Sequence, residues 1–449
     1  MKTKISATVV AHSVNEQGDE LVSVLLVMPR IVLAEFNKHR MLSSNTSSSR
    51  AVPFAKMVEV VENDPFIPIA WQKEHKGMQG TEYFTDNKHI SLIQGNWLQA
   101  RDNAIKIAEG LSGGIYKSTE GVFPPVKVEE GVTKQICNRL LEPFMWCTVL
   151  ATGNRESWNS FFNLRCNSYV LNDYDDYDEI IETQTFKSKK DIITKYPNWY
   201  IRKDDQKRFG KFPKEMSDLE WLELGKGQAE IHMMQLAECL YDAVNESTPR
   251  KLVSGQWHIP FEDKIHINGL QGVQFTLKDG STKYQEAKLT TDDKIKVSVA
   301  LSARTSYTVV GEDNSTPKVG DKVIITNDIN GLNSSMEMYK GKIATITKFE
   351  YPDDEDLVRL DIDGGSWVWD FGKKNDQIEL IKKEVNYENL IALHDRLLTQ
   401  DPPHSSPMEH CSLCVSQEEY DSSFKGQEKG WFRNYKGFKS YRQIIEEAR

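Results

Sequence analysis

The chain has 449 residues and carries 56 Lys and Arg against 66 Asp and Glu, which gives a formal net charge of -10. This acidic balance excludes a globally basic nucleic-acid-binding surface, and no apolar run reaches the roughly 20 residues that span a membrane. The start of the chain meets charged residues before an apolar stretch of adequate length, which argues against a signal peptide. Six cysteines in so long a chain fit reduced thiols, so we expect a cytoplasmic protein of roughly two or three domains.

The first part of the chain predicts two paired strands, a polar loop and a series of helices. The strands are expected over 5–11 and 21–28, with turn residues at 15–18. A helical approach leads to the polar loop 38–50, which combines five serines with cationic side chains. Apolar residues at three- and four-residue spacing then predict helices over 53–61, 96–111, 133–141 and 155–165.

The second part is less uniform. Residues 169–226 have an acidic, tyrosine-rich opening and a basic middle, which is typical of an insertion. A helix is predicted over 228–244, and Trp257–Phe261 closes this segment. Short alternating runs between Gly, Asp and Asn turns over 318–381 predict a small all-β barrel. Further helices are expected over 387–398 and from about 439.

Several common site motifs are absent or incomplete. The chain has no Gly-x-Gly-x-x-Gly, no P-loop, no His-Glu-x-x-His and no Gly-x-Ser-x-Gly. Cys411 and Cys414 form a Cys-x-x-Cys near His404 and His410, but the second ligand pair that a structural zinc site usually has is missing. We therefore expect ordinary buried thiols and no metal site.

The loop 38–50 carries the strongest functional signal. Lys38, His39 and Arg40 offer donors to phosphates or to an electron-rich heterocycle, although a solvated polar loop would have the same composition. The spacing Lys-His-Arg, seven residues, Ser48, then Arg50 resembles the signature of the flavin-dependent thymidylate synthases.

Other segments resemble the remaining motifs of that family, in an unusual order. They are Asn154 with Phe161–Arg165, Gln228–Ile231, Arg139 before Pro143, Ala303–Tyr307 and His404–His410. In the family the last two motifs come first, so the order here resembles a circular permutation, and other stretches resemble long phage-encoded members. The resemblance implies an α/β (α+β) fold: a permuted flavin-dependent thymidylate synthase-like core with an inserted SH3-like barrel. The expected parts are core segments 1–168, 227–316 and 384–449, an insertion at 169–226 and the barrel at 317–383.

The resemblance also implies an activity. The family methylates dUMP to dTMP with methylenetetrahydrofolate, FAD and NADPH, in a homotetramer whose sites are shared among subunits. We therefore expect a dUMP-binding methyltransferase of nucleotide biosynthesis, a homo-oligomer located in the cytoplasm, or in the host cytoplasm if the chain is viral. No membrane is expected, and the inserted barrel is the one part of the chain where binding of nucleic acid is considered.

Carried over residue by residue, the resemblance implies these site residues. The catalytic residues would be Arg165, Ser48 and His404. The substrate-binding residues would be Glu35, Lys38, Ser48, Arg50, Arg139 and Arg165. The cofactor-binding residues would be His39, Arg40, Asn154, Ser306, His404, Ser406 and Glu409. A purely structural role for Arg165 is the alternative, because a cation at the C-terminal end of a helix also complements the helix dipole.

Some positions depart from the family pattern. Lys38 replaces an arginine, Thr46 a glutamate, Glu35 a substrate-facing glutamine and Ser160 an asparagine, and Met408 stands where Phe is common. A glutamate at position 35 lacks the amide donor of a glutamine and adds a negative charge at the edge that faces the base. Two alternatives therefore stay open: dCMP as the substrate, and transfer of a hydroxymethyl group for modified viral DNA. Another alternative is a degenerate relative that binds nucleic acid or an assembly partner through the barrel, with Trp367, Trp369, Lys340 and Lys342 as its surface.

Overall fold

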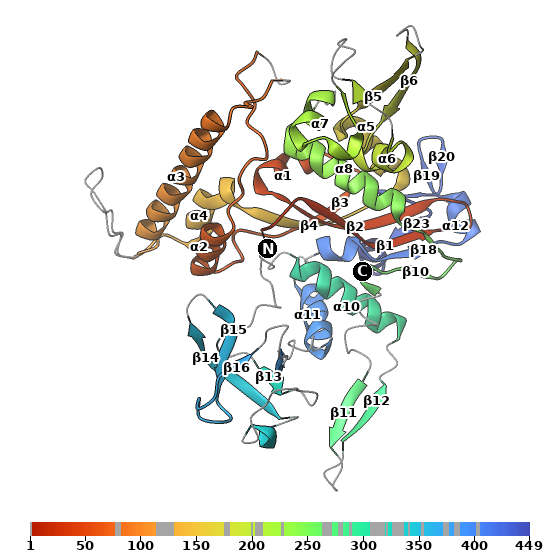
Figure 1. Ribbon diagram of the computed structural model, residues 1–449. Helices are drawn as coiled ribbons and strands as arrows, with labels where there is room; N and C mark the ends of the chain where they lie inside the picture. Colours follow the sequence, from red (N-terminus) through yellow and green to blue (C-terminus); the bar gives the residue numbers. More distant parts are fainter. Residues whose placement is uncertain are drawn as a thin grey trace. The chain divides into compact units, whose positions relative to one another are not determined.

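The computed structural model describes residues 2–76, 82–113, 130–174, 180–198, 201–202, 210–225, 229–262, 272–276, 282–286, 290–305, 319, 322–325, 336–339, 342–351, 354–370, 377–380, 387–400 and 405–449. The fold mixes helices and sheets, as predicted, and divides into two units (Figure 1). The core unit comprises Met1–Ile265, Lys288–Gly311 and Glu388–Arg449. The second unit comprises His266–Ala287 and Glu312–Tyr387.

A five-stranded sheet in the order β3-β4-β2-β1-β9 organises the core unit. Its strands are β1 (Ser6–Val14), β2 (Glu20–Pro29), β3 (Ser43–Thr46), β4 (Trp146–Asn154) and β9 (Arg250–Lys251). The predicted hairpin of β1 and β2 is confirmed, with Gly18 at a φ of 87° in its turn. The expectation of a loop throughout 38–50 is wrong, because residues 43–46 form β3 and pair with β4. A serine- and threonine-rich run is a strand here because a neighbouring strand satisfies its backbone groups.

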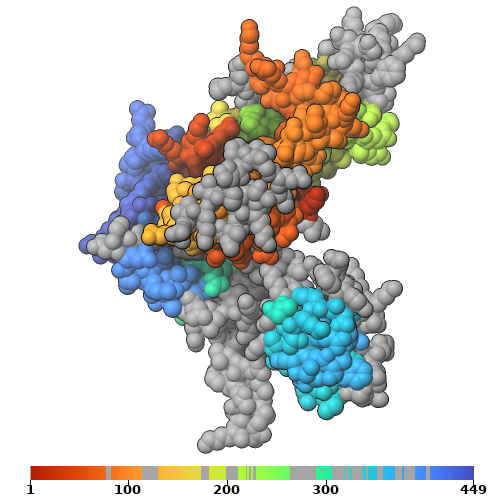
Figure 2. Space-filling model, turned by 90° about the vertical axis from the view of Figure 1, so that its left-hand side faces the viewer, coloured from red at the N-terminus to blue at the C-terminus, as the bar shows by residue number. Residues whose placement is uncertain are grey.

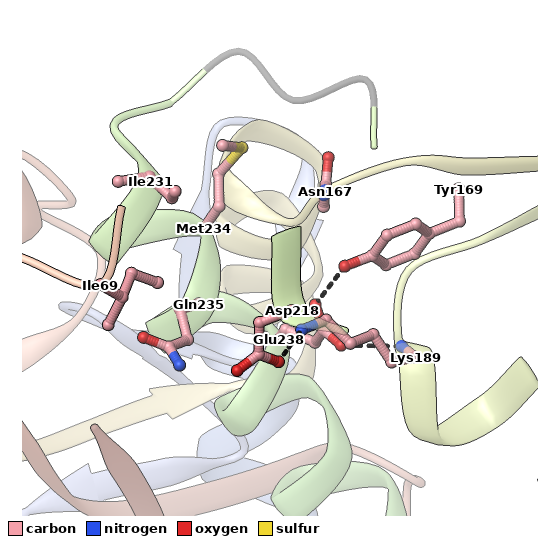
Figure 3. Close-up of a pocket in the computed structure, with 9 residues that line it drawn as sticks. All are labelled: Ile69, Asn167, Tyr169, Lys189, Asp218, Ile231, Met234, Gln235 and Glu238. Atoms are coloured by element: carbon pink, nitrogen blue, oxygen red, sulfur yellow. Dashed lines mark hydrogen bonds and ion pairs between the residues drawn. The ribbon is translucent and has the colours of Figure 1, made fainter. Parts of the chain in front are cut away.

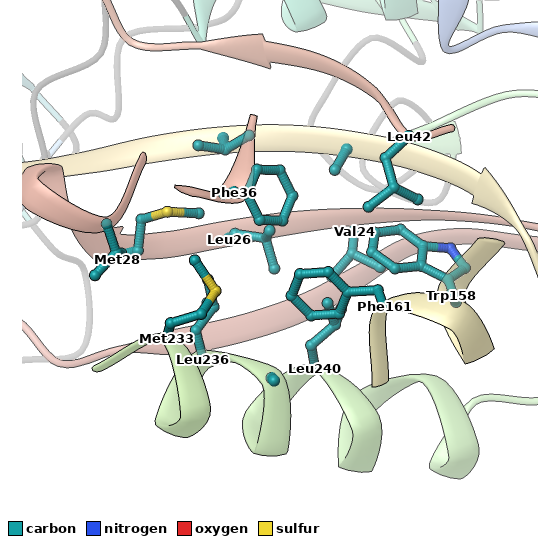
Figure 4. Close-up of a cluster of buried hydrophobic side chains, with 14 of the residues drawn as sticks. Val24, Leu26, Met28, Phe36, Leu42, Trp158, Phe161, Met233, Leu236 and Leu240 are labelled. Atoms are coloured by element: carbon teal, nitrogen blue, oxygen red, sulfur yellow. The ribbon is translucent and has the colours of Figure 1, made fainter. Parts of the chain in front are cut away.

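One face of this sheet packs against two helices, α5 (Arg155–Arg165) and α8 (Ile231–Glu246) (Figures 1 and 4). Alternate residues of β2 point to this face and are fully buried: Val22, Val24, Leu26 and Met28. The helix α8 packs against them with apolar residues at three- and four-residue spacing: Met233, Leu236, Ala237, Leu240 and Val244. This cluster also contains Phe161 and Trp158 of α5, so it fixes the helix that carries Arg165 at its end.

The other face of the sheet is covered by the C-terminal segments. A three-stranded sheet, β10 (Trp257–His258), β18 (Ser412–Cys414) and β23 (Phe438–Ser440), lies there with α10 (Thr291–Arg304) and η5 (Ser406–Glu409) (Figure 1). The helices α11 (Tyr387–Thr399) and α13 (Tyr441–Glu447) complete this layer. The final helix was predicted to begin at about residue 439, but residues 438–440 form β23. The helix α13 begins at Tyr441, and Ser440 caps it.

Besides β3 and β4, the elements between β2 and α5 are helical. They are η1 (Arg30–Val32), α1 (Leu33–Phe36), α2 (Phe54–Asn63), α3 (Asn87–Leu111), α4 (Lys134–Cys137) and η2 (Asn138–Phe144). The helix α3 begins nine residues before its predicted start, where Asp86 caps it by accepting from the backbone of Lys88 and His89. The predicted helix 133–141 is α-helical only to Cys137 and continues as a 3-10 helix that contains Pro143. On the face shown in Figure 2, the atoms of the orange segments α2 and α3 lie at the surface.

The described residues of the range 169–225 form a group of short elements within the core unit. Its elements are β5 (Tyr169–Tyr174), β6 (Ile180–Phe186), α6 (Lys189–Lys195), β7 (Ile201–Arg202), β8 (Gly210–Lys211), η3 (Pro213–Glu215) and α7 (Asp218–Leu224). Its own core contains Tyr169, Leu171, Phe186, Ile192 and Trp221. The last hairpins of the core unit involve α12 (Gln417–Ser422), β19 (Phe424–Lys425), β20 (Glu428–Lys429), β21 (Trp431–Phe432) and β22 (Tyr435–Lys436).

The second unit is built from antiparallel strands. The hairpin of β11 (Gly272–Thr276) and β12 (Thr282–Glu286) is one part. The other is a five-stranded sheet in the order β16-β15-β14-β13-β17, where the barrel was predicted. Its elements are β13 (Lys322–Ile325), η4 (Glu337–Tyr339), β14 (Ile343–Tyr351), β15 (Asp354–Leu360), β16 (Trp369–Asp370) and β17 (Ile378–Leu380). Closure of this sheet into a barrel stays a prediction.

No described helix is both long and apolar enough to cross a membrane.

Candidate active site

Arg165, at the end of α5, is held by two residues of the segment 35–39. Its Nε donates a hydrogen bond to Nε2 of His39 at 2.9 Å. Its Nη1 forms an ion pair with Oε1 of Glu35. The side chains of Arg165 and Glu35 are 19% and 25% exposed, so the pair is half-buried yet open to a ligand. Three of the predicted site residues, from two separate motifs, therefore meet.

The local fold explains why these residues meet. The short helix α1 is anchored by buried Leu33 and Phe36, which places Glu35 on its open side. The backbone N–H of His39 donates to the carbonyl of Phe36 at 3.1 Å and closes a tight turn. The His39 ring then packs edge-on against Phe161, with ring centroids 4.7 Å apart. Phe161 lies one helical turn before Arg165, so α5 presents both contacts on the same face.

The hydrogen bond to Arg165 fixes the protonation of His39. A guanidinium only donates, so Nε2 of His39 is the unprotonated ring nitrogen and Nδ1 carries the hydrogen. Burial and, second, the adjacent Arg165 cation lower the pKa of His39 to about 4. No hydrogen bond joins Oε2 of Glu35 or Nη2 of Arg165 to another described residue. The pair thus offers an acceptor oxygen beside guanidinium donors.

Ser48, Arg50 and Arg139 belong to a second group of predicted residues. Asn138 donates from Nδ2 to the carbonyl of Ser49 at 2.6 Å and to that of Val52 at 3.0 Å. Ser49 Oγ donates to Oε1 of Glu142 at 2.7 Å, which ties the same loop to η2. Arg50 and Arg139 are the chain neighbours of the bonded Ser49 and Asn138.

The cations of the two motifs lie at the surface. Arg50 and Arg139 are exposed, as are Lys38 and Arg40, and none forms an ion pair with another described residue. Along the chain, the strand β3 separates Lys38 and Arg40 from Arg50. Unpaired surface cations of this kind can bind phosphate groups without first breaking a protein contact.

The remaining predicted cofactor residues make mainly structural contacts. Asn154 is buried and donates from Nδ2 to the carbonyls of Glu20 and Lys436, and its Oδ1 accepts from the Lys436 backbone at 2.8 Å. Ser406 Oγ donates to Oδ1 of Asn45 at 3.4 Å, and Glu409 forms an ion pair with Arg442. The predicted Ser306 and His404 lie outside the described residues, as does Gln228.

Some residues that shape these sites have no role in the motif resemblance. Asn138 ties the 48–52 loop to η2, and Arg442 neutralises Glu409 from α13. Asn45 links Ser406 to the carbonyl of Ser302. These contacts join residues far apart in the chain, so no local spacing marks them. For Asn138, its place beside Arg139 was the one available signal.

Cys411 and Cys414 of the Cys-x-x-Cys are buried free thiols. Cys411 precedes the strand β18, and Cys414 is its last residue. Cys411 Sγ donates to Oγ of Ser298 at 3.2 Å, whereas Cys414 Sγ contacts the carbonyl of Leu252. Their different partners agree with an odd spacing along an extended strand, which turns the two side chains to opposite faces. No cluster of metal-ligating side chains is found among the described residues.

A pocket between α8 and the segment 167–218 lies apart from these residues (Figure 3). Its volume is about 30 Å³, the room of one or two water molecules. At its wall, Glu238 accepts hydrogen bonds from the Tyr169 hydroxyl at 2.8 Å and from the backbone N–H of Lys189 at 2.7 Å. Burial raises the pKa of Glu238, and these two hydrogen bonds act in the opposite direction. None of the predicted site residues lines it, and it is too small for a nucleotide.

Comparison with known proteins gives little. No family model matches the chain, and no curated protein matches it. Among solved structures, two ligand complexes of a UMP/dUMP methylase, PolB, from Streptomyces cacaoi are similar to this chain. The complex with 5-Br dUMP has 13% identity and a TM-score of 0.27, covering 37% of this chain and 80% of that chain. The complex with 5-Br UMP has 15% identity and a TM-score of 0.28, covering 37% and 78%. Similarity this low assigns neither fold nor function.

Proposed function

We propose that this chain is a flavin-dependent pyrimidine nucleotide methyltransferase, a circularly permuted relative of the thymidylate synthases that methylates dUMP to dTMP. The observation that carries the proposal is the contact of Arg165 with Glu35 and His39. The motif resemblance places these residues at one site from segments more than a hundred residues apart. A loop that is merely solvated would not be expected to contact the end of α5.

The half-buried pair has the chemistry that a pyrimidine base requires. Uracil presents an N3–H donor beside carbonyl acceptors, and the pair presents the Glu35 oxygen beside Arg165 donors. A guanidinium near the ring also stabilises negative charge on N3 and O2 as C5 becomes nucleophilic. Arg165 would therefore both orient and activate the base, without a protein nucleophile.

The exposed cations Lys38, Arg40, Arg50 and Arg139 fit anionic ligands. Arg50 and Arg139 would hold the 5′-phosphate, with Ser48 and Lys38 as further donors to the substrate, and Arg40 would contact FAD. Their lack of ion pairs with described residues supports this fit. Bound FAD, reduced by NADPH, would supply a hydride, and methylenetetrahydrofolate would supply the one-carbon unit. The separation of the two groups by β3 is compatible with sites shared between subunits of a homo-oligomer.

Purified protein tests this proposal directly. We expect a yellow protein that releases FAD on denaturation and converts dUMP to dTMP with methylenetetrahydrofolate and NADPH. Arg165→Met should lower kcat/KM for dUMP at least about a hundredfold, because it removes a charged donor from the transition state. Arg101→Gln, which removes an arginine paired with Asp102 outside the motifs, is the matched control. Colourless protein that neither binds added FAD nor forms dTMP would refute the proposal.

The carboxylate of Glu35 favours one second candidate, dCMP as the substrate. Cytosine offers its N4 amine to a carboxylate and its N3 acceptor to a guanidinium, which the same pair can match. Mass spectrometry of products from dUMP and dCMP, incubated side by side, separates the two substrates and distinguishes a methyl from a hydroxymethyl product.

The nucleic-acid alternative gains no support from the second unit. Trp369 is fully buried and donates from Nε1 to Asp363 at 2.8 Å, and Trp367 packs against the same core. Lys340 lies outside the described residues, and Lys342 lies over the Tyr339 ring. A buried tryptophan offers no stacking face to a base.

A further inference from the structure

The contact between His39 and Arg165 gives His39 a role that the motif resemblance does not imply. The resemblance assigns His39 to the flavin. In the structure its Nε2 faces Arg165 at 2.9 Å, and its ring face is set by Phe161. Both contacts are to α5, and the backbone N–H and carbonyl of His39 are bonded within the turn 36–42. Two contacts with α5 therefore orient the ring, one at Nε2 and one with Phe161.

We propose that His39 is a positioning residue that accepts a hydrogen bond from Nε of Arg165 and so orients the guanidinium for the nucleobase. Glu35 holds Nη1, and His39 holds Nε. The guanidinium is planar, so holding Nε and Nη1 also fixes the direction in which the Nη2 donors point. The choice of a pyrimidine nucleotide as ligand rests on the proposed function, but the positioning contact does not.

The charge of the group explains why a neutral histidine suits this position. A second carboxylate on Nε would neutralise the cation more fully than a base requires, whereas a cationic histidine would repel it. The charged groups next to the ring are Arg165 from α5 and Glu35 from α1, and Lys38 and Arg40 on its own segment are exposed. A neutral acceptor therefore orients Arg165 and leaves its charge for the ligand.

Two substitutions at His39 separate this role from a flavin contact. His39→Gln places an amide oxygen near the position of Nε2 and keeps the acceptor, whereas His39→Phe keeps a ring against Phe161 and loses the acceptor. We expect His39→Phe to weaken dUMP binding and to lower kcat by about tenfold or more each, and His39→Gln to restore both to within about threefold of the wild type. The FAD affinity, measured by flavin absorbance, should change less than about threefold in both variants.

The contrary pattern overturns the proposal. A direct flavin contact would weaken FAD binding in both variants while leaving dUMP binding to the flavin-free protein unchanged. Equal losses in His39→Gln and His39→Phe would also contradict a role as acceptor. Arg101→Gln again serves as the control for a distant arginine.

A second readout needs neither dUMP nor FAD, so it separates failure of this inference from failure of the proposed function. With ¹⁵N-labelled histidine, and His39 identified by its loss in His39→Gln, the wild-type resonances should show the Nδ1–H tautomer at pH 7. Arg165→Met should release the ring, populate the Nε2–H tautomer and raise the pH at which the ring protonates. Glu35→Gln keeps the Arg165 contact and should leave the tautomer unchanged. An Nε2–H tautomer in the wild type would overturn the inference.

Discussion

Ser23 and Thr152 lie directly opposite each other on β2 and β4, and their hydroxyl oxygens are 2.6 Å apart on the face of the sheet that the C-terminal layer covers. Both are fully buried. Ser23 also bonds Nε2 of His258, and Thr152 bonds Nδ1 of His410. The two hydroxyls thus join the central sheet to β10 and to the residue after η5. The chain of bonds ends on Ser13, which bonds Nδ1 of His258 at 2.9 Å.

Loss of one hydroxyl from this chain should destabilise the protein. Thr152→Val keeps the shape of the side chain but removes the bonds to Ser23 and His410. Ser23 keeps its bond to His258, whereas buried His410 loses the partner of its Nδ1, at a cost of about 1–3 kcal/mol. The free energy of unfolding in urea measures this cost. Thr183→Val, at an exposed position of β6, is the control and should change the unfolding free energy by less than about 0.5 kcal/mol. An equal effect of the two substitutions would show that the buried bonds contribute nothing.

The same histidines should make stability depend on pH. Burial lowers the pKa of His410 to about 3, and burial, then the charges of His12 and Arg250, lowers the pKa of His258 to about 3. In the unfolded chain both groups have a pKa near 6.5, so the unfolded state binds protons first as the pH falls. Their stabilising contribution is therefore complete above about pH 6.5 and is lost progressively from there toward pH 3.

Urea unfolding between pH 6.5 and 5 measures that slope, because most carboxylates stay ionised there. Each buried histidine contributes at most about 1.4 kcal/mol per pH unit. His258→Gln should reduce the slope by up to this amount, whereas His75→Gln, at an exposed position, should leave it unchanged. A slope that His258→Gln does not alter would contradict the buried neutral state.

The apolar cluster beneath the sheet should dominate the stability of the core unit. Leu240 of α8 is fully buried in this cluster (Figure 4), and Leu240→Ala should cost about 2–5 kcal/mol through lost burial and the cavity that remains. Leu164 of α5 is 58% exposed, so Leu164→Ala is a matched control with an expected cost below about 1 kcal/mol. Thermal and urea unfolding report both values, and similar losses would show that α8 is not packed as described.

Asn154 should act mainly as a structural pin. Its side chain bonds the carbonyls of Glu20 and Lys436 and the backbone N–H of Lys436, so Asn154→Ala leaves these backbone groups unpaired near the start of α5. We expect a loss of about 1–3 kcal/mol in unfolding free energy with FAD affinity within about threefold of the wild type. A large loss of FAD affinity in a variant of unchanged stability would instead support the cofactor contact that the resemblance implies.

The phosphate role of Arg50 and Arg139 can be tested by comparing two ligands. Arg139→Gln should weaken binding of dUMP about tenfold or more and leave binding of deoxyuridine unchanged, because only dUMP carries the phosphate. Calorimetric titration measures both affinities, and Arg50→Gln should behave alike. Equal losses for the two ligands would place Arg139 away from the phosphate.

The sequence by itself determined those features that depend on local patterns. The alternation of Val22, Val24, Leu26 and Met28 marks a strand with a buried face, and the spacing within 155–165 predicts α5 with the bounds that the structure gives. The start of α2 after Pro53 and the turn at Gly18 could also be predicted, because proline and glycine influence the backbone conformation at their own positions. The residue types of the candidate site were identified through the spacing of motifs alone.

Only the tertiary structure decided how those residues are used. The strand β3 was missed because its pairing partner lies a hundred residues away, and serine-rich segments have weak strand preference of their own. The clamp of Arg165 by Glu35 and His39 depends on a turn and a helix end that no local spacing connects. Long-range contacts of this kind gain their free energy from burial and geometry between distant segments, so a pattern within one segment cannot specify them.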